Sequence, residues 1–309
     1  MTRKHIYRCP PHLLADNPGR RPPTAVVGAN VNVVLESARL ATDHGLMEPV
    51  FVGDPNVIRR IAHSMQWDIA DYRVVEADDD VAAAEKSVAM ARNGEVKVLM
   101  KGYLHTDVLI RAVLDRRMGL RTGQRLSHVY YMSLADIDRE MIITDSGVNI
   151  APDVEVKLDI VLNAVALAHA LDCQRPRVAL LSATEEPTER MPSSVEAVEV
   201  TRRIQRMGIA CDIQGPLALD NAVAGGAAVL KKIDGPVAGN ADVLVVHNIE
   251  TGNALSKVMV HLMGATAAGL VLGARVPLIV TSRTDPPEAS LAAAAIVARL
   301  IARPAAIAE

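Results

Sequence analysis

Short apolar runs alternate with longer helical patterns along almost the whole chain, and this alternation constrains the fold more than any other feature. Thr24–Gly28, Val50–Gly53 and Val96–Met100 are typical of buried strands, whereas Asn30–Gly45 and Pro152–Cys173 carry the residue spacing of helices. Strands that alternate with helices form mostly parallel sheets that are covered on both faces. The sequence therefore predicts an α/β protein with mostly parallel sheets.

The composition fits such sheets and argues against several classes of function. Half of the 309 residues are hydrophobic but only 2% are aromatic, so aliphatic side chains must fill the core. A net charge of −3, without a basic surface interleaved with aromatic residues, argues against nucleic-acid binding. Three distant cysteines predict neither a disulfide framework nor a zinc site, and no apolar run is long enough to span a membrane. We expect a soluble, cytoplasmic protein without a metal.

Three segments at predicted strand ends carry residues that are suited to chemistry, because parallel sheets bind ligands at the carboxyl ends of their strands. The first segment runs from Lys101 to Asp107 and opens a helix, where free N–H groups favour anions. His105 and Thr106 lie in this segment. Arg111, one turn further along the helix, could donate two parallel hydrogen bonds to a phosphate group.

The second segment follows the predicted strand Asp242–His247. Glu250, Gly252, Asn253 and Lys257 bracket the turn into the next helix, and Asn253 and Lys257 share one helix face. A glycine at this turn would let a ligand approach the backbone closely. The amide of Asn253 supplies both donors and an acceptor.

The third segment, Thr281–Asp285, directly follows the apolar strand Val276–Val280. Ser282 and Arg283 offer a hydroxyl donor and a fixed cation, and both suit an oxyanion or a phosphate. An ordinary turn that closes the strand is the alternative reading of the same residues. Glycine-rich dinucleotide fingerprints, phosphate loops, serine-hydrolase elbows and zinc-protease motifs are absent from the sequence.

Three nearly unbroken motifs occupy the last third of the chain: GPVAGNADVLVV at 235–246, NIETGNALSKV at 248–258 and GATAAGLVLGARVPLIVTSR at 264–283. Weaker motifs occur earlier, in MKGYLHTDVLIRAVL at 100–114 and TDSGVNIAPD at 144–153. Together these segments resemble the family of phosphate acetyltransferases and phosphate butyryltransferases. The resemblance covers nearly the whole chain after about residue 23.

The resemblance implies two α/β/α domains of the isocitrate and isopropylmalate dehydrogenase type, with the active site in the cleft between them. Residues 1–124 and 272–309 would form the first domain, and 125–271 an inserted second domain. Members of the family are usually dimers, so a homodimer or a higher homo-oligomer is expected. The implied partners are acyl-CoA and inorganic phosphate, with coenzyme A as a substrate and no cofactor.

The family motifs also imply roles for individual residues. The catalytic residues would be Ser282, Arg283, Asp285 and Arg111. The substrate-binding residues would be His105, Thr106, Asp145, Ser146, Glu250, Gly252, Asn253 and Lys257. Ala289 stands where longer relatives have an aspartate that is implicated as the base, which leaves Asp285 and Glu288 as alternatives. His247 stands where the family has proline.

The resemblance therefore predicts a phosphate acyltransferase that moves an acetyl, propionyl or butyryl group between coenzyme A and inorganic phosphate through a ternary complex. One alternative is a non-catalytic protein that binds acyl phosphate or coenzyme A, which Ala289 favours. Another is a metal- and NAD-dependent decarboxylating dehydrogenase of the same fold. The absence of an aspartate cluster at metal-binding spacing argues against that dehydrogenase.

Overall fold

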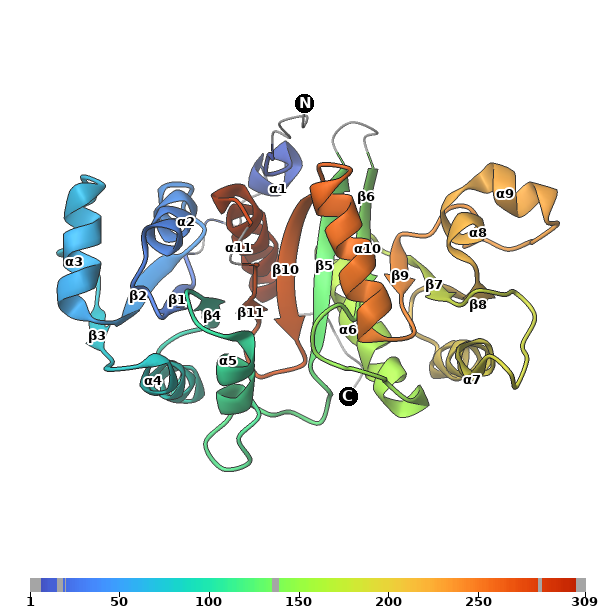
Figure 1. Cartoon of the computed structure of the whole chain (residues 1–309), viewed down its shortest axis with the longest axis horizontal. Helices are drawn as coiled ribbons and strands as arrows, with labels where there is room; N and C mark the ends of the chain where they lie inside the picture. The colour runs from blue at the N-terminus through green and yellow to red at the C-terminus, as the bar shows by residue number, and fades with distance from the viewer. Residues whose placement is uncertain (1–6, 16–18, 20, 135–138, 283–284, 304–309) are drawn as a thin grey trace. The chain divides into compact units, whose positions relative to one another are not determined.

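The computed structural model describes residues 7–15, 19, 21–134, 139–282 and 285–303 (Figure 1). Contacts within the chain divide it into two compact units. One unit comprises the described residues of Met1–Gln124 and Thr266–Pro304, and the other comprises those of Arg125–Ala265. The predicted domain limits, 1–124 with 272–309 and 125–271, stay a prediction.

The first unit contains a sheet with the strand order β3-β2-β1-β4-β11-β10. Its strands are β1 (Pro23–Val27), β2 (Glu48–Gly53), β3 (Val74–Glu76), β4 (Val98–Lys101), β10 (Thr266–Leu272) and β11 (Leu278–Ile279). All neighbours are parallel except β10 and β11. The aliphatic residues of β1 and β4 are buried on both faces, as a central parallel strand requires.

Helices cover both faces of this sheet. They are α1 (Pro11–Ala15), α2 (Asn32–Asp43), α3 (Pro55–Ser64), α4 (Asp80–Arg92), α5 (Thr106–Val113) and α11 (Pro287–Ala302). Figure 1 shows α2 and α11 over one face and α4 and α5 over the other. Two of these helices begin with an aspartate cap, because Asp54 Oδ1 accepts from Asn56 N at 2.8 Å and Asp79 Oδ1 accepts from Ala82 N at 2.8 Å.

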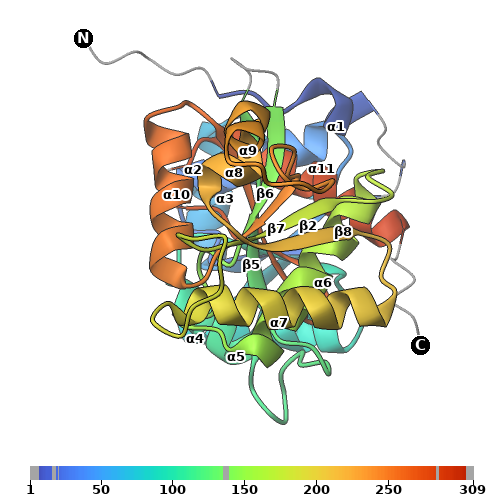
Figure 2. The ribbon, with the colours of Figure 1, turned by 90° about the vertical axis from the view of Figure 1, so that its right-hand side faces the viewer.

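The second unit contains a sheet with the strand order β5-β6-β9-β7-β8, in which only β5 and β6 are antiparallel. Its strands are β5 (Ser127–Leu134), β6 (Arg139–Thr144), β7 (Arg177–Leu181), β8 (Asp212–Leu217) and β9 (Val243–Val245). Its helices are α6 (Val154–Ala170), α7 (Pro192–Met207), α8 (Leu219–Val223), α9 (Gly225–Leu230) and α10 (Ile249–His261). Helices α6 and α7 pack together on one side, opposite α8 and α9 (Figure 2). The predicted α/β class with mostly parallel strands is thus confirmed in both units.

Three differences from the predicted elements have local causes. The residue spacing of 221–232 predicts one helix, but the chain forms two, α8 and α9, because Ala224 adopts an extended conformation between them. The residue spacing of 106–117 also predicts one helix, but α5 ends at Val113. Asp115 Oδ1 accepts from the backbone of Arg117 and Met118, and the chain forms a turn there instead. Strand β10 was not predicted, since its residues TAAGLVL lack alternation and are buried throughout.

Several helices end in the same reverse turn, with one residue in the left-handed conformation. At the end of α3, Gln66 N donates to His63 O at 3.0 Å and Trp67 N donates to Ala62 O at 2.9 Å. These two bonds define a Schellman motif, whose left-handed position favours glycine. Gln66 occupies that position with φ +52°. Gly208 occupies the left-handed position after α7, with φ +68°.

Two single substitutions, one at each position, test how much a side chain in the left-handed conformation lowers the stability of the protein. Gln66→Gly should raise the free energy of unfolding by about 1 kcal/mol, since a side chain at positive φ costs more than the extra freedom of glycine. Gly208→Gln, the reverse exchange, should lower it by about the same amount. Space around Gly208 is open, so a clash contributes nothing to that loss. Urea denaturation measures both, and a destabilised Gln66→Gly protein would contradict the account.

Candidate functional site

The carboxyl ends of β1, β4 and β11 lie side by side, because the three strands are parallel neighbours. Gly102, directly after β4, packs on the connection that follows β1. A Cβ at Gly102 would lie 2.4 Å from Val27 O and 2.6 Å from Gly28 O, so only glycine fits. Tyr103 N donates to Gly28 O at 3.1 Å and ties the two connections together.

A small cavity of about 30 Å³ opens at this edge of the first unit. Lys101 from β4 and Ser282 and Asp285 from the connection after β11 line it. A cavity of this size holds little more than one water molecule. The structure therefore brings two predicted catalytic residues, Ser282 and Asp285, to one point, while Arg283 lies outside the described residues.

Lys101 begins the first of the three segments but is not among the predicted catalytic or substrate-binding residues. Its side chain is buried although it carries a charge, and Nζ donates to Gly102 O at 3.2 Å and to Leu104 O at 3.3 Å. A buried ammonium needs such partners, and it attracts anions more strongly than an exposed one. The signal in the sequence was a lysine as the last residue of a buried apolar strand.

Asp285 shapes the connection that presents Ser282. Its Oδ2 accepts from Ser282 N at 2.7 Å, and its own N–H donates to Ser282 O at 3.0 Å. Both residues are half-buried. The two other candidate positions for the catalytic base do not place a carboxylate in the cavity. Ala289 is buried in the first turn of α11, and Glu288 does not line the cavity. Asp285 is thus the carboxylate that lies beside Ser282.

The predicted residues of α5 lie apart from this cavity. His105 is the exposed N-cap of α5, followed by the half-buried Thr106. Arg111 is exposed and forms an ion pair with Asp107, 3.3 Å from Nη2 to Oδ2. Its side chain lines a separate cavity of about 510 Å³ between α4 and α5, and it is not among the residues that line the cavity of Ser282.

In the second unit, Asp145 organises the connection after β6. The Thr144–Asp145 peptide bond is cis. The buried carboxylate accepts from Gly147 N at 2.8 Å and Val148 N at 2.9 Å, and from the backbone and side-chain amides of Asn149 at 3.1 and 2.6 Å. With these bonds, the carboxylate holds its own loop together.

Helix α10 is fastened to that loop through its buried face. A Cβ at Gly252 would lie 2.4 Å from Asp145 O, so the close approach that glycine permits here is to the protein's own backbone. The hydroxyls of Ser146 and Ser256 are 3.2 Å apart. Glu250, Asn253 and Lys257 lie on the exposed face of the helix. The buried residues thus position α10, and the polar ones are presented to solvent.

His247 follows β9 and is half-buried near a charged pair. The buried Lys157 of α6 donates to Glu196 of α7. Burial lowers the pKa of His247 below its ordinary value of 6.5, and the positive charge of Lys157 lowers it further, whereas Glu196 and Glu250 act in the opposite direction. Below pH 6.5, His247 is therefore harder to protonate in the folded protein than in the unfolded chain.

The cysteines are unsuited to thiolate chemistry. Burial raises the pKa of Cys9 to about 12 and that of Cys211 to about 11. Burial is also the main cause of a raised pKa at Cys173. Among the described residues, no three His, Cys, Asp or Glu side chains gather where they could hold a metal ion. Nor does any helix in the described part of the chain have the length and apolarity to cross a bilayer.

Gly252→Ala tests the attachment of α10. The added methyl group would overlap Asp145 O, and we expect a loss of about 1–3 kcal/mol in the free energy of unfolding. Asn253→Ala, one residue further on the exposed face, is the control and should change stability by less than about 0.5 kcal/mol. Equal unfolding curves for Gly252→Ala and the parent protein would contradict this packing.

The pH dependence of stability tests the environment of His247. Since its pKa is lowered by folding, the unfolded chain binds more protons below pH 6.5, and stability is complete above that pH and falls as the pH drops through the folded pKa. His247→Gln should flatten this fall. His261→Gln, on the exposed end of α10, is the control and should keep it. An unchanged acid limb in His247→Gln, measured by thermal unfolding, would contradict the assignment.

Comparison with known proteins identifies the family of this chain. Residues 80–298 match the sequence profile described as phosphate acetyl/butaryl transferase. The chain is 43% identical over 270 residues to the phosphate acetyltransferase of Rhizobium meliloti, covering 87% of this chain and 85% of that protein. It is 37% identical over 278 residues to the phosphate butyryltransferase of Clostridium acetobutylicum, covering 89% of this chain and 92% of the relative.

A solved structure agrees with the sequence matches. The crystal structure of a branched-chain phosphotransacylase from Enterococcus faecalis superimposes with a TM-score of 0.78 at 30% sequence identity. The match covers 90% of this chain and 99% of that protein. The predicted resemblance and fold class are both confirmed. The chain belongs to the phosphate acetyl/butaryl transferase family.

Proposed function

We propose that the chain is a phosphate acyltransferase, which moves a short acyl group between coenzyme A and inorganic phosphate through a ternary complex. The observation that carries the proposal is the buried Lys101 beside Ser282 at the carboxyl edge of the first unit's sheet. A fixed cation and a hydroxyl donor at one point suit a reaction in which negative charge develops on a carbonyl oxygen. Family membership favours transfer over a non-catalytic or dehydrogenase role.

The reaction needs few protein groups. A phosphate oxygen attacks the thioester carbonyl, the new C–O bond forms, and the C–S bond breaks to release the thiolate of coenzyme A. Ser282 Oγ donates to the oxyanion, and the charge of Lys101 stabilises it. In the reverse direction the thiol must lose a proton, for which Asp285 is the proposed acceptor. No histidine lines this cavity among the described residues, which supports Ser282 as a donor rather than a nucleophile.

The second unit contributes an exposed binding face in this proposal. Lys257 and Asn253 would bind the anionic and polar groups of coenzyme A, as their exposure on α10 permits. Asp145, Ser146 and Gly252, which are predicted to bind substrate, would also position that helix. Glu250 would lie at the margin of the bound coenzyme. His105 and Thr106 keep their predicted roles in substrate binding, and Arg111 and Arg283 keep their predicted catalytic roles. The homo-oligomeric state and the cytoplasmic location also stay predictions.

Thiol release tests the proposed reaction directly. Acetyl-, propionyl- and butyryl-CoA should each be tried with and without inorganic phosphate, and free thiol should appear only with phosphate. Arsenate should replace phosphate, because the attack needs only a similar oxyanion. Absence of turnover on all three thioesters, in either direction, would contradict the proposal.

Variants at the cavity separate the proposed roles. Ser282→Ala should lower kcat by about 10²–10³, the usual cost of one transition-state donor, with KM nearly unchanged. Lys101→Met should lower kcat/KM for phosphate, whereas the exposed Lys97→Met is the control and should not. Asn253→Ala should raise KM for coenzyme A by about tenfold, because a lost hydrogen bond affects binding. A fully active Ser282→Ala enzyme would show that this hydroxyl has no part in the chemistry.

A further inference from the structure

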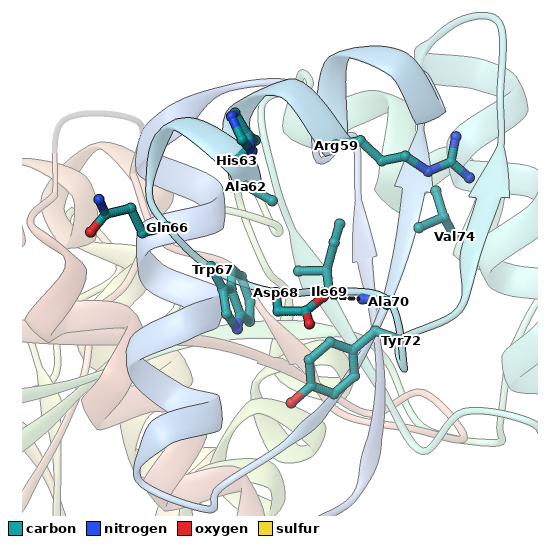
Figure 3. A pocket seen from close by; sticks show the side chains of 10 residues that line it. All are labelled: Arg59, Ala62, His63, Gln66, Trp67, Asp68, Ile69, Ala70, Tyr72 and Val74. Atoms are coloured by element: carbon teal, nitrogen blue, oxygen red, sulfur yellow. Dashed lines mark hydrogen bonds between the residues drawn. The ribbon is translucent and has the colours of Figure 1, made fainter.

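A larger cavity lies at the opposite edge of the first unit's sheet. It has a volume of about 590 Å³ and is formed by the second half of α3, the connection that follows it and Val74 at the start of β3 (Figure 3). Connections from a helix into a strand lie at the amino edge of a parallel sheet, away from the edge that carries Ser282. The cavity is therefore separate from the candidate active site, and its volume lies in the range of small-molecule sites.

Aromatic side chains form the floor of this cavity. Trp67 and Tyr72 line it, with ring centres 6.0 Å apart and planes at 56°. Behind them lies the fully buried Phe51, whose ring is 5.5 Å from that of Trp67 and 6.3 Å from that of Tyr72, edge to face with both. The chain contains a single tryptophan, a single phenylalanine and five tyrosines, so this one place holds three of its seven aromatic rings.

This concentration of rings differs from the rest of the core. Elsewhere in the described residues the interior is filled chiefly by Ala, Val, Leu, Ile and Met, with Tyr131 as a buried aromatic residue. Tyr72 is only half-buried, so part of its ring faces the cavity. The Schellman motif after α3 fixes the backbone at Trp67. The ring of Phe51 packs against the rings of Trp67 and Tyr72 and restricts their movement. Tyr72 is therefore held in place by two buried rings, and its exposed part offers a rigid surface on which a flat ligand can stack at low entropic cost.

The rim of the cavity carries polar groups of complementary kinds. Arg59 and His63 from α3 supply a guanidinium and an imidazole, and both are exposed. Asp68 lies beside the rings in Figure 3, and its Oδ1 accepts from Ala70 N at 3.0 Å. Figure 3 shows Arg59 on the far side of Ile69 from the two rings. The cavity thus offers stacking at one end and a positive charge at the other.

We propose that this cavity binds a nucleotide, that is, an aromatic heterocycle joined through a sugar to a phosphate. The heterocycle stacks on the half-buried ring of Tyr72, with the buried Trp67 beside it, as bases do on aromatic side chains. The carboxylate of Asp68 accepts from the sugar hydroxyls, as acidic residues do in nucleotide sites. Arg59 binds the phosphate. The proposal does not depend on acyl transfer.

The single tryptophan makes the test specific to this cavity. Trp67 is the chain's only indole, so its emission, excited where purines do not absorb, reports on this site alone. AMP is the probe, with adenosine and ribose 5-phosphate as fragments. AMP should change the emission saturably, adenosine should do so at concentrations about tenfold higher, and ribose 5-phosphate should leave it unchanged. No saturable change with AMP at millimolar concentration would overturn the proposal.

Single substitutions test which residues contact the phosphate of the ligand and which contact its heterocycle. Arg59→Ala should weaken AMP binding by about tenfold and leave adenosine binding unchanged, because it removes only the phosphate contact. Arg60→Ala removes the same charge from the neighbouring exposed position outside the cavity, and it should have no effect. Tyr72→Leu should weaken AMP and adenosine alike by about tenfold. An equal loss in Arg59→Ala and Arg60→Ala would show general charge attraction and would overturn the site.

Discussion

Close packing of backbone on backbone at the strand ends is the constraint on which both candidate binding surfaces depend. In the first unit, Gly102 lies against Val27 O and Gly28 O, so the connections after β4 and β1 meet. In the second unit, Gly252 lies against Asp145 O, so α10 meets the loop after β6. A methyl group at either position would push the elements apart. The glycines therefore set the distance between neighbouring connections, and the proposed function uses the polar residues that these connections carry.

The charged groups at these edges are arranged by burial. Lys101 is buried and held by two carbonyl oxygens, so its charge has a fixed position. The carboxylate of Asp145 accepts backbone and side-chain N–H groups and sets the shape of a loop. By contrast, Asn253 and Lys257 are exposed and remain available to a ligand. Burial immobilises a charged group, whereas exposure lets a polar group exchange partners. The buried charges therefore suit the proposed chemistry, and the exposed groups suit the proposed contacts with coenzyme A.

Much of the fold follows from the sequence, because apolar runs of strand length and helical spacing survive as β1, β2, β4, α2 and α6. Strand β10 does not, since a buried run of Ala, Gly and Leu carries no periodicity. Within the site, the position of Ser282 and Asp285 after a strand correctly predicts that they lie at the carboxyl edge of the sheet. The same pattern does not distinguish residues that face a cavity from residues that hold the surrounding loops in place. Lys101 and Gly252 show why. Lys101 meets Ser282, and Gly252 meets Asp145 O, only where segments far apart in the chain come together, and no local pattern reports those contacts.

Direct transfer without a covalent acyl-enzyme is the central claim, because Ser282 is interpreted as a hydrogen-bond donor. Isotope exchange between labelled coenzyme A and acetyl-CoA tests it most directly. If Ser282 only donates, the acyl group leaves coenzyme A only when phosphate is present to receive it. The account therefore predicts no exchange in the absence of phosphate and exchange when phosphate is added. Exchange without phosphate would require an acyl-enzyme intermediate and would contradict the account.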